Sequence, residues 1–230
     1  MKILITGASR GIGKFLCDYY LRQGYLVAGY SRSGSDLKHE NYLDFKGSVA
    51  SEADVAAAIS YLRSEWKSLD VLINNAGVAR MIPFALTPPQ TARDVMEVNY
   101  LGTFIATHAA IRLLRKSDSA SIVNLTSIAV PLRLEGEISY AAAKAAIEEF
   151  TRIAARELAE FGITCNALGP SPIKTDLIRN IGEDKLQSLL KRQAISRMAT
   201  LEDAANVVDF FISEKSRMVT GQGVYLGGVG

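Results

Sequence analysis

The segment Thr6-Gly7-Ala8-Ser9-Arg10-Gly11-Ile12-Gly13 decides the fold of this chain of 230 residues. An apolar run of strand length, residues 2–6, precedes it, and apolar side chains recur at helical spacing after it. Gly7 can adopt a tight turn, Gly11 lets the backbone approach a pyrophosphate, and Gly13 lets the new helix pack closely on the strand. The free N–H groups and the positive dipole end of that helix attract phosphate. The segment therefore predicts a strand, a phosphate-binding turn and a helix.

The rest of the chain continues this alternation of strands and helices. Several apolar runs are continuous, which is typical of parallel strands covered on both faces. Strands are predicted over residues 2–6, 25–31, 42–45, 71–74, 121–125, 164–168 and 224–226. Helices are predicted over residues 12–20, 55–66, 91–116 with a break near Asn99, 140–160 and 202–212. This order predicts an α/β fold, a single-domain Rossmann-type doubly wound, mostly parallel sheet with helices on both faces.

The composition is that of an ordinary globular protein, with 48% hydrophobic residues, 22% charged residues and a net charge of +2. The sequence has no polybasic run that would favour nucleic acid, and no apolar stretch approaches the roughly 20 residues that span a bilayer. The only cysteines, Cys17 and Cys165, stand in apolar surroundings, which indicates a reducing compartment without a disulfide framework. With only two histidines besides, a structural zinc site is not expected. We therefore expect a cytoplasmic protein with no nucleic-acid partner, no membrane partner and no metal.

Further motifs follow the predicted strands, at the edge where sheets of this kind bind ligands. They are Asn74-Asn75-Ala76-Gly77, Ser127, Tyr140-Ala141-Ala142-Ala143-Lys144, residues 166–175 and Thr220-Gly221-Gln222. Together with Asn99 and the glycine spacing of the first turn, they resemble the short-chain dehydrogenase/reductase family over nearly the whole chain. The resemblance implies an enzyme that transfers hydride with a nicotinamide cofactor.

The predicted catalytic residues are Asn99, Ser127, Tyr140 and Lys144. Tyr140 and Lys144 are four residues apart and so share one face of a helix. A phenol with an ordinary pKa of about 10 is a poor acid–base catalyst at neutral pH, and a nearby ammonium group is expected to lower that pKa. Tyr140 is therefore predicted to exchange a proton with the substrate oxygen. The family resemblance implies that Lys144 binds the nicotinamide ribose, Ser127 holds the substrate oxygen, and Asn99 positions a water for proton relay.

The end of the second predicted strand decides which nicotinamide cofactor is preferred. An acidic residue there would bind the ribose 2′-hydroxyl and repel a 2′-phosphate, but residues 30–33 contain none. Arg32 offers a bidentate fork to phosphate, and Ser31 and Ser33 add hydroxyl groups. Arg10 is a second basic group that could reach the same phosphate. We therefore predict NADP as the cofactor, with NADPH favoured over NADH.

Cofactor contacts are predicted from the glycine turn to the segment after the sixth strand. The residues are Gly7, Ser9, Arg10, Gly11, Ile12, Gly13, Ser31, Arg32, Ser33, Ser48, Val49, Asn75, Ala76, Gly77, Tyr140, Lys144, Pro170, Ile173 and Thr175. Most of these assignments rest on the family resemblance.

Besides Leu226, which replaces the aspartate of the family's common V-D-G-G ending, three features depart from the family pattern. Ser48-Val49 stands where the family has Asp-Val, which puts one adenine contact in question. Ser171 follows Pro170 where the family has glycine, and if that position needs a positive φ, serine costs about 1 kcal/mol or shifts the loop. The connection from Arg32 to Tyr42 is short, so we expect its helix to be absent or reduced to a turn.

Substrate specificity is expected from the loop 128–139 and from a substrate lid at about 172–197, which carry apolar side chains among basic ones. Residues 1–230 are predicted to form one dinucleotide-binding and catalytic domain. We predict an NADP(H)-dependent oxidoreductase that acts on a small-molecule carbonyl compound or secondary alcohol. Two alternatives are a 3-oxoacyl-thioester (acyl carrier protein) reductase and a non-catalytic NADP-binding sensor or scaffold. The family resemblance also suggests a homodimer or homotetramer built from helices 99–116 and 140–160.

Overall fold

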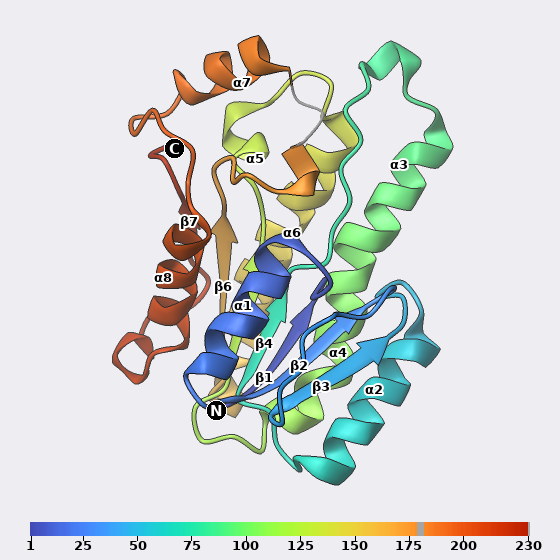
Figure 1. Ribbon diagram of the computed structural model, residues 1–230, viewed down its shortest axis with the longest axis vertical. Coiled ribbons are helices and arrows are strands. Elements are labelled where there is room, and N and C mark those ends of the chain that lie inside the picture. The colour runs from blue at the N-terminus through green and yellow to red at the C-terminus, as the bar shows by residue number, and fades with distance from the viewer. Residues whose placement is uncertain (179–181, 230) are drawn as a thin grey trace.

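The structure, a computed structural model, describes residues 1–178 and 182–229 of the chain. Within these residues, seven strands form one sheet in the order β3-β2-β1-β4-β5-β6-β7, each parallel to its neighbours (Figure 1). The strands are β1 Lys2–Thr6, β2 Leu26–Ser31, β3 Tyr42–Lys46, β4 Val71–Asn74, β5 Ser121–Leu125, β6 Thr164–Gly169 and β7 Gly223–Tyr225. After β3 the chain crosses to the other side of β1, so the strand order reverses between β1 and β4. The predicted doubly wound α/β fold is confirmed.

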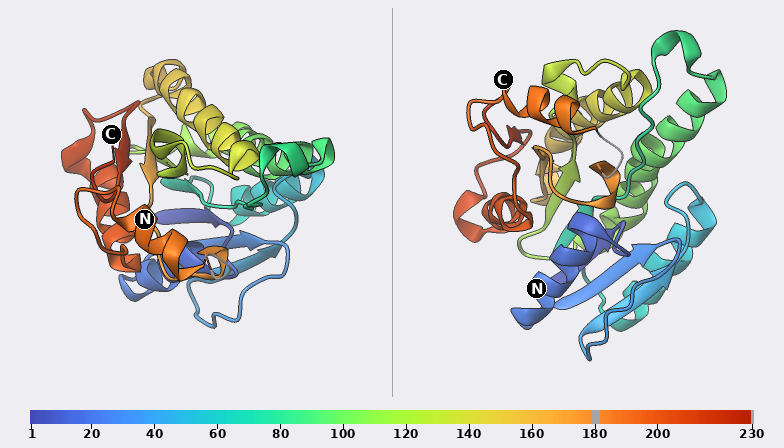
Figure 2. Two further views of the ribbon diagram at one scale, coloured as in Figure 1. Left: turned by 90° about the horizontal axis from the view of Figure 1, so that it is seen from above. Right: turned by 45° about the horizontal axis from the view of Figure 1, so that its top comes forward.

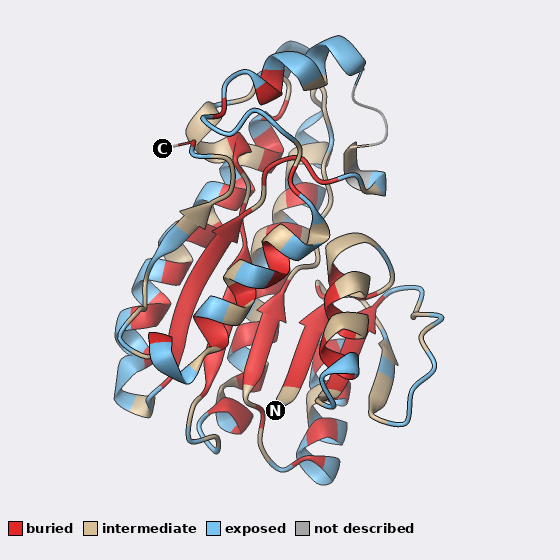
Figure 3. Ribbon diagram, turned by 60° about the vertical axis from the view of Figure 1, so that its left-hand side comes forward, coloured by how far each residue is buried: buried red, intermediate tan, exposed pale blue. Residues whose placement is uncertain are grey.

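Helices cover both faces of the sheet (Figures 1 and 2). One face carries α1 (Gly11–Arg22) and α8 (Leu201–Ile212), and the other carries α2 (Glu52–Glu65), α4 (Gly102–Leu114) and α6 (Ile138–Glu157). Along β1, Ile3 and Ile5 enter the first core and Leu4 enters the second, which is the two-residue period of a strand. Figure 3 shows the central strands buried between helices whose outer sides are exposed. Burial on both faces explains why these strands are continuous apolar runs.

The helix predicted over residues 91–116 is broken near Asn99, as expected. α3 (Pro89–Met96) passes into a π-helical turn, η2 (Glu97–Leu101), before α4 begins at Gly102. A π turn inserts one residue into the helical repeat and is common at functional sites. Here it places Asn99 at a fully buried position.

The connection between β2 and β3 contains no helix, as its length predicts. Asp44 of β3 holds this loop, because its two carboxylate oxygens accept hydrogen bonds from the Ser35 N–H at 3.1 and 3.2 Å. Lys14 of α1 pairs with Asp36 of the loop at 2.6 Å. Arg32 therefore follows β2 directly, at the carboxyl edge of the sheet.

Short elements complete the described part of the chain. They are η1 (Phe84–Leu86), α5 (Ala129–Leu132), η3 (Ala159–Phe161), η4 (Asp176–Ile178), α7 (Glu183–Leu190) and η5 (Glu214–Ser216). α7 lies in the predicted lid 172–197, of which residues 179–181 lie outside the described residues. Across the described ranges, no helix combines the length and apolar character needed to cross a membrane.

Candidate active site

A cleft opens at the carboxyl edge of the sheet, lined by the segments after β4, β5 and β6 and by side chains of α6 and α7. The predicted site residues that line it are Ile12, Asn75, Gly77, Ser127, Tyr140, Lys144, Pro170, Ile173 and Thr175. The other predicted residues lie outside this lining, in the glycine turn, at the ends of β2 and β3, and behind the cleft. They are Gly7, Ser9, Arg10, Gly11, Gly13, Ser31, Arg32, Ser33, Ser48, Val49, Ala76 and Asn99. The fold thus gathers three of the four predicted catalytic side chains into one cavity.

The glycine turn after β1 forms a cradle that side chains would fill. Gly7 and Gly11 have φ values of 71° and 55°, which other residues rarely adopt. A Cβ on Gly7 would lie 2.7 Å from Asn75 Nδ2, and a Cβ on Gly13 would collide with the Gly7 carbonyl oxygen. Asn75 locks the turn to β4, because its Nδ2 donates to the carbonyl oxygens of Thr6 at 2.9 Å and Gly7 at 3.2 Å. The first turn of α1 carries no acidic side chain, so its N–H groups fit a pyrophosphate.

The end of β2 combines an unpaired hydroxyl group with cationic side chains. Ser31 Oγ is buried and has no hydrogen-bond partner in the part of the chain that the structure describes. Arg32 beside it is exposed, and Arg10 extends from the glycine turn to within 3.8 Å of Asp176. A buried hydroxyl without a partner is costly unless a ligand satisfies it. These groups therefore fit a phosphate on the adenosine ribose.

Ser48 and Val49 lie at the same edge, before α2. The Ser48 N–H donates to the Asp54 carboxylate at 3.0 Å, and the Ser48 carbonyl accepts from the Tyr30 hydroxyl at 3.0 Å. Val49 is buried and packs against Gly102 of α4. The contact is so close that a Cβ added to Gly102 would lie only 2.6 Å from Val49 Cγ2. Packing holds both residues in place, and their contact with adenine stays a prediction.

Asn99 and Lys144 meet on either side of Gly77. Asn99 Oδ1 accepts from the Val78 N–H at 2.7 Å, and its Nδ2 donates to the Val78 carbonyl at 2.9 Å. A Cβ on Gly77 would lie 3.3 Å from Asn99 Oδ1 and 3.5 Å from Lys144 Nζ. Lys144 Nζ itself donates to the Leu125 carbonyl at 2.6 Å, at the end of β5. Three distant segments of the sequence therefore meet at this glycine.

Tyr140 is buried in the cleft, and its surroundings keep its hydroxyl group protonated. Burial raises the pKa of Tyr140 to about 12, although a hydrogen bond with Ser127 opposes the shift, and Glu137 adds to it. Burial also lowers the pKa of Lys144 to about 8, and its Nζ lies 5.7 Å from the centroid of the Tyr140 ring. The sequence predicted a lowered pKa for Tyr140, and for this structure that prediction is wrong. Desolvation of the phenolate dominates, and the Lys144 Nζ donates to the Leu125 carbonyl.

Lys144→Met should remove a pH dependence of folding stability between about pH 8 and pH 10.5, the folded and ordinary pKa values of this lysine. In that window the unfolded chain binds more protons than the folded chain, so wild-type stability rises with pH. Below it, the wild-type protein bears the full cost of a buried ammonium group. Chemical unfolding of both proteins at several pH values measures the difference. Parallel stability curves through this window would contradict the assignment.

A buried carboxylate one helical turn beyond Lys144 joins three elements. Glu148 Oε1 of α6 accepts hydrogen bonds from the Thr126 hydroxyl at 2.7 Å and from the Tyr225 hydroxyl of β7 at 2.5 Å. Thr126 directly precedes Ser127, so this network ties β7 and α6 to the loop that carries Ser127. Sequence reasoning missed Glu148 and Tyr225. The available signal was the four-residue spacing of Glu148 from Lys144, which puts both on one face of α6.

Tyr225→Phe should lower the free energy of unfolding by about 2 kcal/mol, because a buried carboxylate loses a hydroxyl donor. Urea unfolding measures the change. Tyr61→Phe is the matched control, since Tyr61 of α2 is 48% exposed and a surface change of this kind stays within about 0.5 kcal/mol. Equal stability of the two variants would show that the hydrogen bond to Glu148 contributes nothing.

Ser171 does not carry the backbone strain that was expected if this position needs a positive φ. Among the described residues other than glycine, only Lys67 and Arg133 have a positive φ. The buried Ser171 hydroxyl instead donates to Gln193 Oε1 at 2.7 Å. Serine therefore anchors the loop after β6 to the segment that follows α7.

The chain is similar to known proteins in sequence and in structure. Residues 7–228 match the family described as Enoyl-(Acyl carrier protein) reductase. The 3-oxoacyl-(acyl-carrier-protein) reductase FabG of Staphylococcus aureus is 33% identical over 236 aligned residues, which cover 98% of this chain and 96% of that protein. FabG of Salmonella typhimurium is 29% identical, with 98% and 95% of the two chains covered. The ligand-free structure of the aldohexose dehydrogenase of Thermoplasma acidophilum matches with a TM-score of 0.90 at 26% identity, covering 99% of this chain and 92% of that one.

Proposed function

The chain belongs to the short-chain dehydrogenase/reductase family, and we propose that it reduces a carbonyl compound, or oxidises the corresponding secondary alcohol, with NADP(H). It is an oxidoreductase that uses a nicotinamide cofactor. The observation that carries the proposal is the meeting of Ser127, Tyr140 and Lys144 in one cleft, next to the cradle of the glycine turn.

The cofactor site extends from the glycine turn to the cleft. In our proposal, the backbone of residues 7–13 and the first turn of α1 hold the pyrophosphate, and Lys144 binds the hydroxyl groups of the nicotinamide ribose. Ile12, Ile173 and Thr175 line the cleft beside these groups. The bound nicotinamide supplies a hydride in reduction and accepts one in oxidation.

Tyr140 is the proposed general acid in reduction. It is buried, and with a pKa of about 12 it keeps its proton at neutral pH, ready for the substrate oxygen. Ser127 is proposed to donate a hydrogen bond to the same oxygen and so to stabilise the charge that develops there. Asn99 holds the backbone at Val78, and we propose that a water beside it relays protons to Lys144.

The preference for NADP over NAD is supported by the end of β2. Residues 30–33 include no carboxylate, Ser31 Oγ is buried without a partner among the described residues, and Arg32 is exposed beside it. A phosphate on the ribose would satisfy the hydroxyl group and pair with the guanidinium. A ribose 2′-hydroxyl would gain much less from Arg32.

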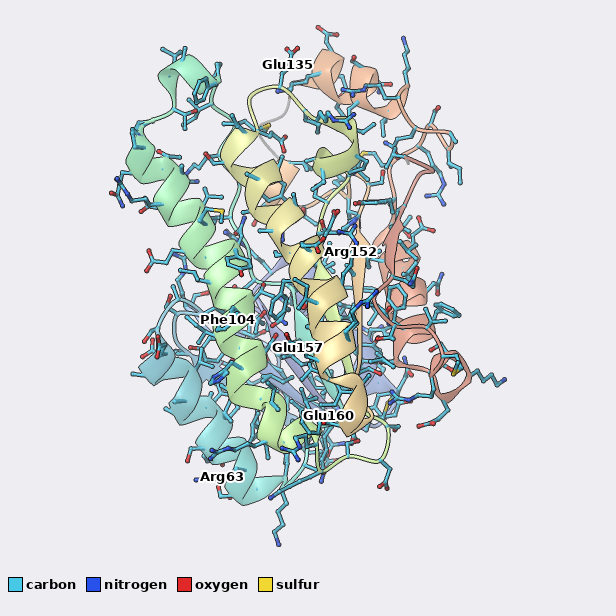
Figure 4. The ribbon with its side chains drawn as sticks, turned by 180° about the vertical axis from the view of Figure 1, so that it is seen from behind. Arg63, Phe104, Glu135, Arg152, Glu157 and Glu160 are labelled. Atoms are coloured by element: carbon cyan, nitrogen blue, oxygen red, sulfur yellow. The ribbon has the colours of Figure 1, made fainter. Side chains whose placement is uncertain are left out.

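We propose a homodimer or homotetramer that buries the outer face of α4 and α6. Figure 4 shows this face, with Phe104 on α4 and Arg152 and Glu157 on the neighbouring α6. Leu101 and Phe104 are 45% exposed and Ile153 is 48% exposed. Burying such apolar side chains between two copies removes them from water, which is the main driving force of association.

The location in the cell is proposed from the cysteines. Cys17 and Cys165 are both buried as free thiols. Thiols of this kind persist in a reducing compartment, so we propose the cytoplasm.

A second candidate function is the reduction of a 3-oxoacyl thioester on acyl carrier protein. It is supported by the names of the FabG relatives, which are 33% and 29% identical over nearly the whole chain. Glu157 at the end of α6 and Glu160 of η3, both labelled in Figure 4, weaken it, because an acidic carrier protein needs a basic surface on which to dock.

The experiment that tests the proposed function follows NADPH oxidation with a panel of ketones, sugars and 3-oxoacyl thioesters. We expect turnover with one class of carbonyl compound, and the class decides between the two candidates. NADPH binding without oxidation by any member of a broad panel would favour a sensor or scaffold.

A further inference from the structure

A carboxyl group that the proposed mechanism does not use faces the same cleft. Glu137 ends the loop between α5 and α6, three residues before Tyr140, and is 8% exposed. It lines the cleft together with Tyr140, Met81, Leu134 and Leu189. Sequence reasoning placed it within the specificity loop 128–139 and gave it no role of its own.

The backbone holds Glu137 firmly in this position. Its N–H donates to the Leu134 carbonyl at 3.3 Å, and its carbonyl accepts from the Ala141 N–H at 2.7 Å. The preceding residue, Gly136, accepts from the Ile82 N–H at 2.8 Å, which ties the loop to the segment after β4. The side chain therefore belongs to a fixed wall of the cleft.

Within residues 1–178 and 182–229, no side-chain hydrogen bond to the carboxyl group of Glu137 is seen, although its backbone groups are paired. Burial raises its pKa, and the ammonium group of Lys185 on α7 opposes that shift. The Glu137 residue is 8% exposed, but its carboxyl oxygens are not among the fully buried unpaired atoms, so the cleft leaves them accessible to a ligand. A carboxyl group that lines a substrate cleft can obtain its partner from the substrate.

The position of Glu137 sets where such a partner lies. The hydrogen bond from Ala141 to Glu137 closes the first turn of α6, so Glu137 and Tyr140 are neighbours on one side of the helix. Side chains three residues apart on a helix have Cβ atoms about 5–6 Å apart. A substrate whose carbonyl oxygen bonds to Tyr140 would therefore present an atom one or two carbons away to Glu137.

We propose that Glu137 is a specificity-determining residue that accepts a hydrogen bond from a hydroxyl group one or two carbons from the reacting carbonyl. The substrate class is then a hydroxylated carbonyl compound, such as a hydroxyketone or a sugar. This inference rests on the proposed function of the cleft. A 3-oxoacyl thioester fits less well, because its neighbouring carbonyl group offers only an acceptor. A cationic donor is disfavoured by Lys144, which lines the cleft, and by the positive charge of Lys185, which acts on Glu137.

The test compares 1-hydroxybutan-2-one with butan-2-one, which lacks only the hydroxyl group, and with 3-oxobutanoyl-CoA. We expect wild-type protein with NADPH to prefer the hydroxyketone over butan-2-one by about tenfold or more in kcat/KM. Glu137→Leu should bring that ratio close to one, and Glu137→Gln, which keeps one acceptor oxygen, should give an intermediate ratio. Glu135→Gln is the matched control, since this exposed carboxylate stands two residues earlier on the same loop (Figure 4), and it should keep the wild-type ratio.

The outcomes separate this inference from the proposed function. A wild-type ratio near one, an unchanged ratio in Glu137→Leu, or a preference for the thioester overturns the role of Glu137. Calorimetric binding of the two ketones to the complex with NADP⁺, which cannot reduce them, gives the ratio of their affinities without turnover. Failure to reduce any of the three compounds therefore counts against the proposed function, while the affinity ratio still decides the role of Glu137. If Glu137→Leu does not fold, the wild-type ratio and Glu137→Gln decide it.

Discussion

Tyr140→Phe will lower kcat about a thousandfold, because phenylalanine has no proton to give to the substrate oxygen and general acid catalysis contributes on this scale. The ring of Tyr140 is buried, so the variant keeps its packing and loses only the hydroxyl group. Ser127 would still polarise the carbonyl group, which leaves a residual rate above that without enzyme. Steady-state NADPH oxidation with the substrate found in the panel measures the loss.

NADPH binding provides the control for this variant. Its affinity should stay nearly unchanged in Tyr140→Phe, because the phosphates and the adenosine end are held by other residues. Tyr61→Phe, at an exposed tyrosine of α2, should leave both turnover and binding as in the wild type. Turnover by Tyr140→Phe at a rate near that of Tyr61→Phe would refute the acid–base role of Tyr140.

Arg32→Ala should weaken NADPH binding by about 10-fold to 100-fold while leaving NADH binding nearly unchanged. The predicted partner of the guanidinium is the 2′-phosphate, which NADH lacks, so the loss falls on one cofactor only. Arg32 is exposed and lies at the end of β2, where its removal leaves the sheet intact. Fluorescence titration with each cofactor measures the two dissociation constants.

Arg63→Ala is the matched control for this experiment. Arg63 is an exposed arginine in the last turn of α2, and it should affect neither cofactor. Equal losses for NADPH and NADH in Arg32→Ala would show that Arg32 does not bind the 2′-phosphate. The preference for NADP would then have to come from another group or be abandoned.

Much of the fold could be predicted from the sequence, because its central strands are buried on both faces and are therefore unbroken apolar runs. The edge strands β3 and β7 are only partly buried, and all seven strands were predicted with small errors at their ends. β2 starts at Leu26, one residue later than predicted, because the Tyr25 N–H still bonds to the Tyr20 carbonyl at the end of α1. The missing helix between β2 and β3 was also predictable, because chain length limits what a connection can hold.

Site residues could be predicted only where they belong to a motif of residues close together in the sequence. Residues 6–13 and the spacing of Tyr140 from Lys144 are local features, and the structure places them at the carboxyl edge. The roles of Glu137, in a loop, and of Glu148, in a helix, were missed, because a glutamate resembles a solvated surface residue until its surroundings are known.

The amino-acid sequence by itself determined the order of strands and helices, the glycine turn and the face that Tyr140 shares with Lys144, since these depend on residues close together in the chain. Only the tertiary structure decided which distant residues meet in the site and how its ionisable groups titrate. It brings Gly77, Asn99 and Lys144 together, pairs Glu148 with Tyr225, and raises the pKa of Tyr140 where the sequence predicted a decrease. The physical reason is that desolvation and hydrogen-bond partners depend on what packs around a group, and here the packing comes from distant segments of the chain.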